Sequence, residues 1–141
     1  MRILIVCVAN YCRSPVAEKI LQEMLPSHDI ASAGINPYPS STMDSRSIDF
    51  LQMENIKGIN HLPKRVTKGM IDNHDLILAM DITVLHFLNN LSPNNKSKYK
   101  IFNFLDNSIS VADPVKLSKD KYNLIMKNIY ELCIKIKQYF A

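Results

Sequence analysis

Runs of consecutive apolar residues alternate along this chain with segments in which apolar residues recur every three or four positions. Residues 3–8 form a continuous apolar run rich in β-branched side chains, which is typical of a strand buried on both faces. Shorter runs at residues 29–34, 75–80 and 100–105 predict three further strands. In the segments between and after these runs, apolar residues recur at helical spacing.

Four segments combine helical spacing with residues that favour a helix start. The first begins at Ser14-Pro15, because proline is tolerated in the first helical turn, and Pro26 closes it. The N-caps of the other three are predicted at Asp44, Asp81 and Ser118. The last helix carries one apolar stripe, which we assign to the core rather than to a cofactor site, formed by Tyr122, Ile125, Ile129, Cys133, Ile136 and Phe140.

The alternation of strands and helices predicts an α/β fold in which a four-stranded parallel sheet has helices on both faces. A chain of 141 residues has about the length of one domain, so we assign residues 1–141 to a single domain. In such folds the loops at the carboxyl ends of the strands carry the functional groups. Cys7 lies near the end of the first predicted strand and therefore at that edge.

Composition and charge narrow the classes of partner. The chain has 17 Lys and Arg against 13 Asp and Glu, but the basic residues are scattered, which favours a solvated surface over a nucleic-acid site. No apolar run approaches the roughly 20 residues needed to cross a bilayer, and the N-terminus has no signal-peptide cleavage pattern. We therefore expect a cytoplasmic protein with no nucleic-acid or membrane partner, while export without a recognisable signal stays open. The three cysteines argue against a disulfide scaffold.

The segment between the first strand and the first helix carries the strongest chemical signal. Cys7 and Arg13-Ser14 form a C-x5-R-S pattern at the junction of a buried strand with a helix start. The backbone N–H groups of such a loop converge, and an arginine fork adds two donors, so the segment suits a phosphate dianion. The same field stabilises a thiolate, which makes Cys7 a candidate nucleophile. The candidate phosphate-binding residues are Val8, Ala9, Asn10, Tyr11, Cys12, Arg13 and Ser14.

An acid for the same chemistry is available at Asp113. The proline at position 114 disfavours helical geometry at the residue before it, so Asp113 is expected in an extended loop that presents its carboxyl group. Taken alone, a C-x5-R match or an Asp-Pro turn is common. Their joint occurrence favours catalysis over the alternatives, which are a buried strand cysteine, a surface ion pair of Arg13 and an ordinary turn.

These residues resemble the low-molecular-weight protein tyrosine phosphatase family over nearly the whole chain. Residues 7–15 are similar to the family's C-x-G-N-x-C-R-S-P loop. Four further pieces follow in the family's order, namely the Ser-Ala-Gly after the second strand, a loop histidine, the Met-Asp after the third strand and the Asp-Pro acid loop. They correspond here to Ser32-Ala33-Gly34, His61, Met80-Asp81 and Asp113-Pro114.

The resemblance implies a phosphomonoester hydrolase without metal or other cofactor, which acts on a phosphotyrosine-containing protein or another phosphomonoester and releases inorganic phosphate. It implies that Cys7 attacks phosphorus to form a phosphocysteine, that Arg13 and the loop amides stabilise the equatorial oxygens, and that Asp113 protonates the leaving oxygen and then activates water. One carboxyl group in both roles favours mildly acidic pH. In the family a strained loop asparagine is held by serine and histidine side chains, a role that would fall on Asn10, Ser14, Ser32 and His61.

The chain departs from the family pattern at two places. Ala9 stands where the loop usually has glycine, which would cost about 1 kcal/mol if that residue needed positive φ. After Asp113-Pro114 the family usually places aromatic residues, whereas this chain has Val115 and Lys116. Tyr11 and Tyr38 are the candidates for a substitute aromatic rim, so phosphotyrosine is the leading substrate while its rank over other phosphomonoesters stays open.

Two other functions compete on the same scaffold. Arsenate reduction needs a relay of further thiols, and only two cysteines remain beside Cys7. A phosphate-binding module that has lost catalysis explains the altered loop and acid region but not the retained Asp113. Cys12 is either a packing residue or the partner that traps oxidised Cys7 as a reversible disulfide, and metal binding is disfavoured because further ligands do not cluster with it. Cys133 is assigned to the core.

Overall fold

Four parallel strands form the centre of the protein. The computed structural model describes residues 1–141 and contains β1 (Arg2–Cys7), β2 (Asp29–Gly34), β3 (Leu76–Ala79) and β4 (Tyr99–Ile101). Their order in the sheet is β2-β1-β3-β4, and every neighbouring pair is parallel. This arrangement confirms the predicted fold class, because each strand returns to the same edge through a helical crossover.

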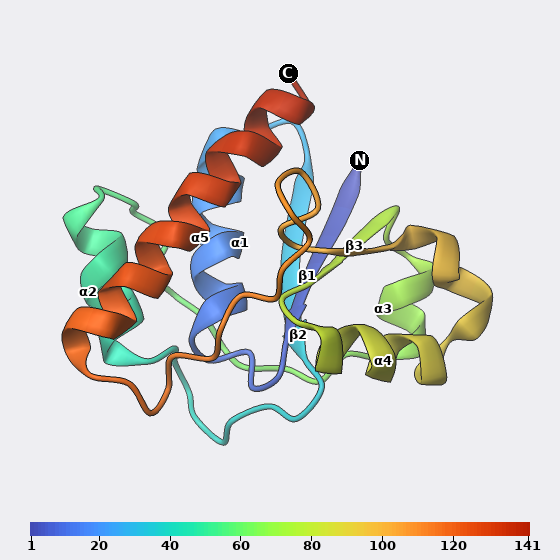
Figure 1. The fold of residues 1–141 in the computed structure, drawn as a ribbon, viewed down its shortest axis with the longest axis horizontal. Helices are drawn as coiled ribbons and strands as arrows, with labels where there is room; N and C mark the ends of the chain where they lie inside the picture. The colour runs from blue at the N-terminus through green and yellow to red at the C-terminus, as the bar shows by residue number, and fades with distance from the viewer.

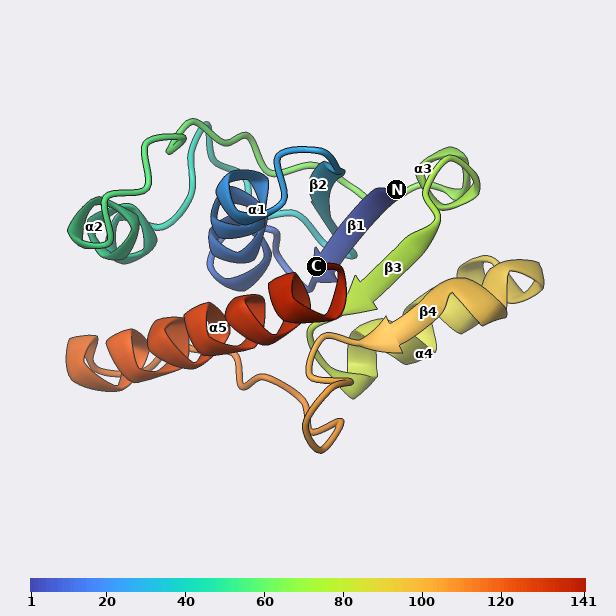
Figure 2. The same cartoon turned by 90° about the horizontal axis from the view of Figure 1, so that it is seen from above.

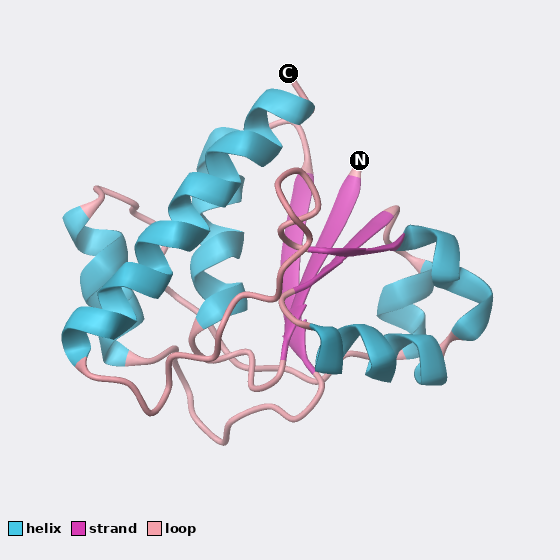
Figure 3. Ribbon diagram, in the orientation of Figure 1, coloured by secondary structure: helices cyan, strands magenta, loops and turns pink.

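Helices cover both faces of the sheet (Figures 1 and 2). On one side lie α1 (Arg13–Met24), α2 (Ser45–Met53) and α5 (Lys119–Tyr139), with α2 packed on α1 and α5. The other side is covered by α3 (Lys68–Asp72) and α4 (Ile82–Leu91), and a 3₁₀ helix, η1 (Pro93–Lys98), leads from α4 into β4. The loops that follow β1 and β2 gather at the carboxyl edge of the sheet (Figure 3).

The side chains of β1 alternate between two hydrophobic cores. Ile3, Ile5 and Cys7 belong to the larger core, which α1 and α5 complete, and Leu4 and Val6 belong to the smaller core on the other face. Both faces of this strand are buried, as the continuous apolar run predicts. Cys7 therefore ends its strand on the same face as α1, the helix that the following loop enters.

Three of the four predicted helix starts are confirmed, and the fourth helix, α1, begins at Arg13, one residue before the predicted Ser14. The carboxylates of Asp44 and Asp81 accept hydrogen bonds from backbone amides in the first turns of α2 and α4, and the Ser118 hydroxyl does so for α5. The apolar stripe of α5 is also largely confirmed, since Tyr122 and Ile136 are among its fully buried residues. These signals are local, so tertiary contacts did not override them.

The fourth strand is shorter than predicted. It covers Tyr99–Ile101 instead of residues 100–105, because the chain turns after Phe102, whose amide makes the last bond to β3. The turn is stabilised by the Asn103 side chain, which donates to the side chain of Asn107, and by the Asn103 carbonyl, which accepts from Ser108. Helix α3 and η1 were not predicted, since both are too short to show a helical period.

The longest helix, α5, is amphipathic, and none of the helices has the length and hydropathy of a membrane span.

Candidate active site

The loop between β1 and α1 is held in place by hydrogen bonds that its carbonyl groups accept from residues 35–47. The segment of residues 35–47 donates hydrogen bonds of 2.8 to 3.1 Å to the carbonyl oxygens of Cys7, Val8, Ala9, Tyr11 and Cys12. In a trans peptide the N–H of the next residue points opposite to the carbonyl. The amides of the loop therefore point inward, and one of them, that of Asn10, donates to the Cys7 sulfur at 3.2 Å.

Asn10 has the left-handed backbone conformation that makes this turn possible, with φ of 50°. Its fully buried side-chain amide donates to the hydroxyls of Ser14 at 2.8 Å and Ser32 at 3.0 Å, while its oxygen accepts from the Lys64 amide at 3.0 Å. The ring of His61 lies 2.8 Å from the Asn10 carbonyl oxygen. The structure thus places Ser14, Ser32 and His61, the three residues that the resemblance names as its supports, around the strained asparagine.

The hydrogen-bond directions in this cluster follow from its fixed donors and acceptors. The Ser32 hydroxyl donates to the Glu18 carboxylate at 2.7 Å, so its oxygen is available to accept from Asn10. Ser14 also accepts from Asn10, which leaves its own proton for the Cys7 sulfur at 2.9 Å. Two donors, the Ser14 hydroxyl and the Asn10 amide, therefore point at the sulfur of Cys7, a residue that is only 2% exposed.

His61 is held as a neutral donor. Burial lowers the pKa of its imidazole below the ordinary value of 6.5, and the bond to the Asn10 carbonyl offsets this only in part. A carbonyl oxygen is an acceptor, so the Nε2 atom of the neutral ring carries the proton. The ring therefore fixes the strained peptide without placing a positive charge beside it at neutral pH.

The expected penalty at Ala9 does not arise. The residues with positive φ are Asn10, Asn55 and Ser108, so Ala9 has ordinary backbone geometry and a methyl group is tolerated there. The steric requirement lies instead at Gly34 in β2, where an added Cβ would lie 2.8 Å from the Val8 carbonyl oxygen and 2.9 Å from the Asn10 amide nitrogen. The sequence marks Gly34 only through the resemblance, because the close approach depends on strand pairing.

Arg13 is almost fully buried, with 2% of its side chain exposed. One terminal nitrogen donates to the Asp81 carboxylate at 2.8 Å and to the Val111 carbonyl at 2.7 Å. These bonds use one end of the guanidinium, and the side chain lines the cavity above Cys7. Asp81 was predicted as a helix cap and as part of the family's Met-Asp piece, but its role as the partner of Arg13 appears only in the folded structure.

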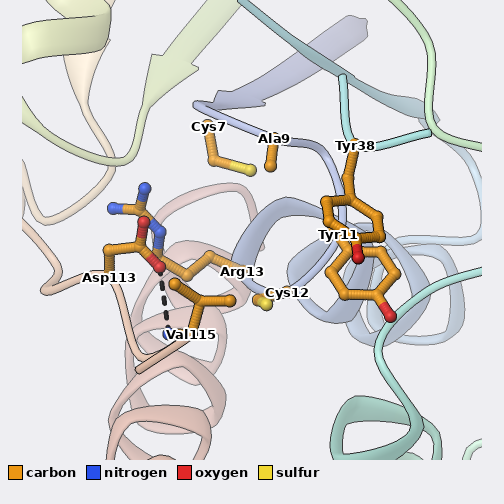
Figure 4. A pocket seen from close by; sticks show the side chains of 8 residues that line it. All are labelled: Cys7, Ala9, Tyr11, Cys12, Arg13, Tyr38, Asp113 and Val115. Carbon is orange, nitrogen blue, oxygen red and sulfur yellow. Dashed lines mark hydrogen bonds between the residues drawn. The ribbon is translucent and has the colours of Figure 1, made fainter. Parts of the chain in front are cut away.

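A cavity of about 250 Å³ opens above the loop (Figure 4). The aromatic rings of Tyr11 and Tyr38 lie together on one side, with centroids 4.3 Å apart, and Asp113 lies on the other. The Asp113 carboxylate accepts from the amide of Val115 at 3.1 Å, which orients one of its oxygens. The lining residues are Cys7, Ala9, Tyr11, Cys12, Arg13, Tyr38, Asp113 and Val115.

The other two cysteines differ from Cys7. Cys12 lines the same cavity, but burial raises the pKa of its thiol to about 12, with the nearby Asp44 carboxylate adding to the effect. Cys133 is fully buried in the larger core, and burial raises the pKa of its thiol as well. Both therefore keep their protons at neutral pH, and only Cys12 is near the cavity.

Comparisons with known proteins agree with this geometry. The family described as low molecular weight phosphotyrosine protein phosphatase matches residues 2–140 of the chain. A relative from Klebsiella pneumoniae, named as a putative low molecular weight protein-tyrosine-phosphatase, is 30% identical over 127 residues, which cover 90% of this chain and 88% of the relative.

Two solved structures are similar over almost the whole chain. Vibrio vulnificus Wzb in complex with benzylphosphonate has a TM-score of 0.91 and 28% identity, and the match covers 98% of this chain and 97% of that one. YwlE arginine phosphatase from Geobacillus stearothermophilus has a TM-score of 0.90 and 25% identity, with 99% and 92% covered. The family match and these relatives show that the chain belongs to the low molecular weight phosphotyrosine protein phosphatase family, whose members are cysteine-dependent phosphatases.

Proposed function

We propose that this protein hydrolyses phosphomonoesters through a phosphocysteine on Cys7, and that aryl phosphates such as phosphotyrosine are its preferred substrates. The observation that carries the proposal is the position of the Cys7 sulfur. It lies at the base of a cavity beneath inward-pointing amides, and Arg13 and Asp113 line the same cavity. Such an arrangement supplies a nucleophile, a site for the phosphoryl oxygens and a proton donor together.

In the first step the Cys7 thiolate attacks phosphorus in line with the ester oxygen. A sulfur–phosphorus bond forms while the phosphorus–oxygen bond breaks, and Asp113 transfers its proton to the departing oxygen so that an alcohol or phenol leaves. The loop amides and the Arg13 guanidinium hold the three equatorial oxygens. The Ser14 hydroxyl and the Asn10 amide stabilise the sulfur before attack and as the leaving group in the second step.

In the second step water replaces the cysteine. Asp113, now a carboxylate, takes a proton from the water as its oxygen attacks phosphorus, the sulfur–phosphorus bond breaks and inorganic phosphate leaves. The cycle returns Cys7 to a thiolate and Asp113 to its acid form. Because one carboxyl group must start protonated, we predict highest activity at mildly acidic pH.

The walls of the cavity support an aryl leaving group. Tyr11 and Tyr38 present aromatic surface on one side, with their rings in contact and tilted by 30°, and Val115 presents an aliphatic group on the other. An aromatic contact between these rings and a substrate ring is worth about 0.5–1.5 kcal/mol, or up to roughly tenfold in specificity. The guanidinium of a phosphoarginine substrate would need a carboxylate as its partner. Asp113 is the only carboxylate that lines the cavity, and because the mechanism uses it as the acid, none is left to bind a guanidinium.

A substrate panel on the purified protein tests the proposal. We expect hydrolysis of phosphotyrosine to exceed that of phosphoserine and phosphoarginine, loss of all turnover in Cys7→Ser, and a loss of about 10²–10⁴-fold on phosphotyrosine in Asp113→Asn. Full activity of Cys7→Ser would refute the mechanism, and preference for phosphoarginine would refute the substrate class.

The same panel separates the two competing functions. Thiol-dependent turnover of arsenate would identify a reductase, although the cavity offers only Cys12 as a further thiol and Cys133 is enclosed in the core. Tight binding of a phosphopeptide without phosphate release in a single turnover would identify a binding module.

A further inference from the structure

The segment that carries Asp113 has no regular secondary structure between β4 and α5, so its position depends on a few individual bonds. On the N-terminal side of Asp113, the Val111 amide donates to the Met80 carbonyl and the Val111 carbonyl accepts from Arg13 at 2.7 Å. These bonds fix the chain two residues before the acid. The chain after the acid needs a separate anchor, because Pro114 has no amide to donate.

That anchor is Arg46 in the first turn of α2. Its two terminal nitrogens donate to the carbonyl oxygens of Val115 at 3.1 Å and Leu117 at 3.2 Å. Its guanidinium also lies 4.0 Å from the ring centroid of Tyr122, at the start of α5. Arg46 therefore contacts the chain just beyond Asp113 and the helix into which that chain runs.

The same guanidinium is linked through Asp44 to residues 8–14, the loop between β1 and α1 together with the first two residues of α1, which we call the phosphate-binding loop. Two nitrogens of Arg46 donate to the two Asp44 oxygens at 3.0 and 2.8 Å, and the Asp44 amide donates to the Tyr11 carbonyl at 2.9 Å. Burial raises the pKa of the Asp44 carboxyl, but the hydrogen bonds and charge of Arg46 outweigh this and hold it below its usual value. The pair thus stays ionised at the mildly acidic pH at which Asp113 would act.

We infer that Arg46 is a positioning residue for Asp113. By linking residues 111–117, which we call the acid segment, to the phosphate-binding loop, Arg46 sets the distance between the Asp113 carboxyl group and Cys7. This inference rests on the proposed function. The link needs an arginine because three separate acceptors, a carboxylate and two carbonyls, surround one planar fork. A lysine has a single nitrogen and reaches fewer of them.

The leaving group provides a readout that a merely structural role would not move. An acid matters most when the departing oxygen is strongly basic, as in phenyl phosphate, and much less for p-nitrophenyl phosphate, whose phenolate leaves readily. We expect Arg46→Gln to lower kcat/KM for phenyl phosphate by about 10- to 100-fold more than for p-nitrophenyl phosphate. Inhibition by inorganic phosphate should change little, because the phosphate-binding loop keeps its other anchors.

A double-mutant cycle with Asp113→Asn completes the test. With the acid removed, Arg46→Gln should have almost no further effect on phenyl phosphate, because there is no proton donor left to position. Arg46→Lys keeps the charge and should give a smaller leaving-group effect than Arg46→Gln. If Arg46→Gln unfolds, Arg46→Lys takes its place in the double-mutant cycle. The matched control is Arg2→Gln, which also removes one arginine charge but lies at the start of β1, at the end of the strand away from Cys7.

The outcomes separate this inference from the proposed function. If the unmodified protein hydrolyses neither aryl phosphate, the proposed function is wrong. If it hydrolyses both but the Arg46 variants lower the two rates equally, or lower them as much in the Asp113→Asn background, the positioning role is wrong.

Discussion

Replacement of Gly34 by alanine tests how the phosphate-binding loop is supported. The new Cβ would lie 2.8 Å from the Val8 carbonyl oxygen, 2.9 Å from the Asn10 nitrogen and 3.0 Å from the Ala9 carbonyl carbon. All three are backbone atoms of the loop, so no flexible side chain can move aside. Gly34 itself is held in β2, and its amide donates to the Lys64 carbonyl at 2.8 Å.

The strain must therefore appear in stability, in phosphate affinity, or in both. Overpacking of a close contact costs about 1–3 kcal/mol, and each 1.4 kcal/mol corresponds to about tenfold in affinity. If the strand moves, we expect the free energy of unfolding to fall by that amount. If the loop moves instead, stability is kept and the affinity for inorganic phosphate falls by up to about a hundredfold. Urea unfolding and competitive inhibition by phosphate measure the two terms.

The other two glycines are matched controls. The nearest atom to an added Cβ is the Thr67 hydroxyl oxygen at 3.8 Å for Gly69 and the Lys19 Cδ at 3.9 Å for Gly58, both ordinary contacts. Gly69→Ala in α3 should raise stability by about 0.5–1 kcal/mol, because alanine favours a helix, and Gly58→Ala should be close to neutral. If Gly34→Ala matches the unmodified protein in both stability and phosphate affinity, the close approach of β2 to the loop does not constrain residue 34.

Three further predictions concern the same loop. Iodoacetamide at neutral pH should alkylate Cys7, with phosphate giving protection, while Cys12 and Cys133 react slowly because burial raises the pKa of both thiols; mass spectrometry that finds Cys12 modified first would contradict this. Asn10→Ala removes three hydrogen bonds and leaves alanine at φ of 50°, so unfolding in urea should show a loss of about 3–5 kcal/mol, and a loss below about 1 kcal/mol would exclude the assigned bonds. Burial lowers the pKa of His61 in the folded protein, so the unfolded chain binds a proton at this histidine more readily. The contribution of His61 to stability should therefore be fully present above pH 6.5 and be lost as the pH falls through the lowered pKa of the folded protein. In His61→Gln the midpoint of urea unfolding should depend less on pH in that range.

Much of the fold could be predicted because its signals are local. The apolar run of β1 and the caps at Asp44, Asp81 and Ser118 depend on neighbouring residues and act in the folded chain as they do in the sequence pattern. The predicted end of β4 was wrong, because the observed end depends on the turn at Asn103 and on the length of the neighbouring β3. A strand's length is decided jointly with its partner, which a single segment does not reveal.

The candidate site divides in the same way. The spacing of Cys7 and Arg13, together with Asp113-Pro114, was enough to indicate phosphate chemistry, because the nucleophile and the anion site lie in one short segment at a strand end. The supports of that segment come from distant parts of the chain. Asp81 is 68 positions from Arg13 and Leu117 is 71 positions from Arg46, and only the crossovers of the sheet bring them into contact.

The sequence by itself therefore identified the chemical groups of the candidate site, since the spacing of Cys7 and Arg13 at a strand end and the Asp113-Pro114 pair already name a thiol, a guanidinium and a carboxyl group suited to phosphate chemistry. What the tertiary structure decided is their geometry. It replaced the expected constraint at Ala9 by one at Gly34, and it joined the acid segment to the phosphate-binding loop through Arg46. The physical reason is that steric contact and hydrogen bonding depend on distance in space, which the order of residues along the chain does not specify.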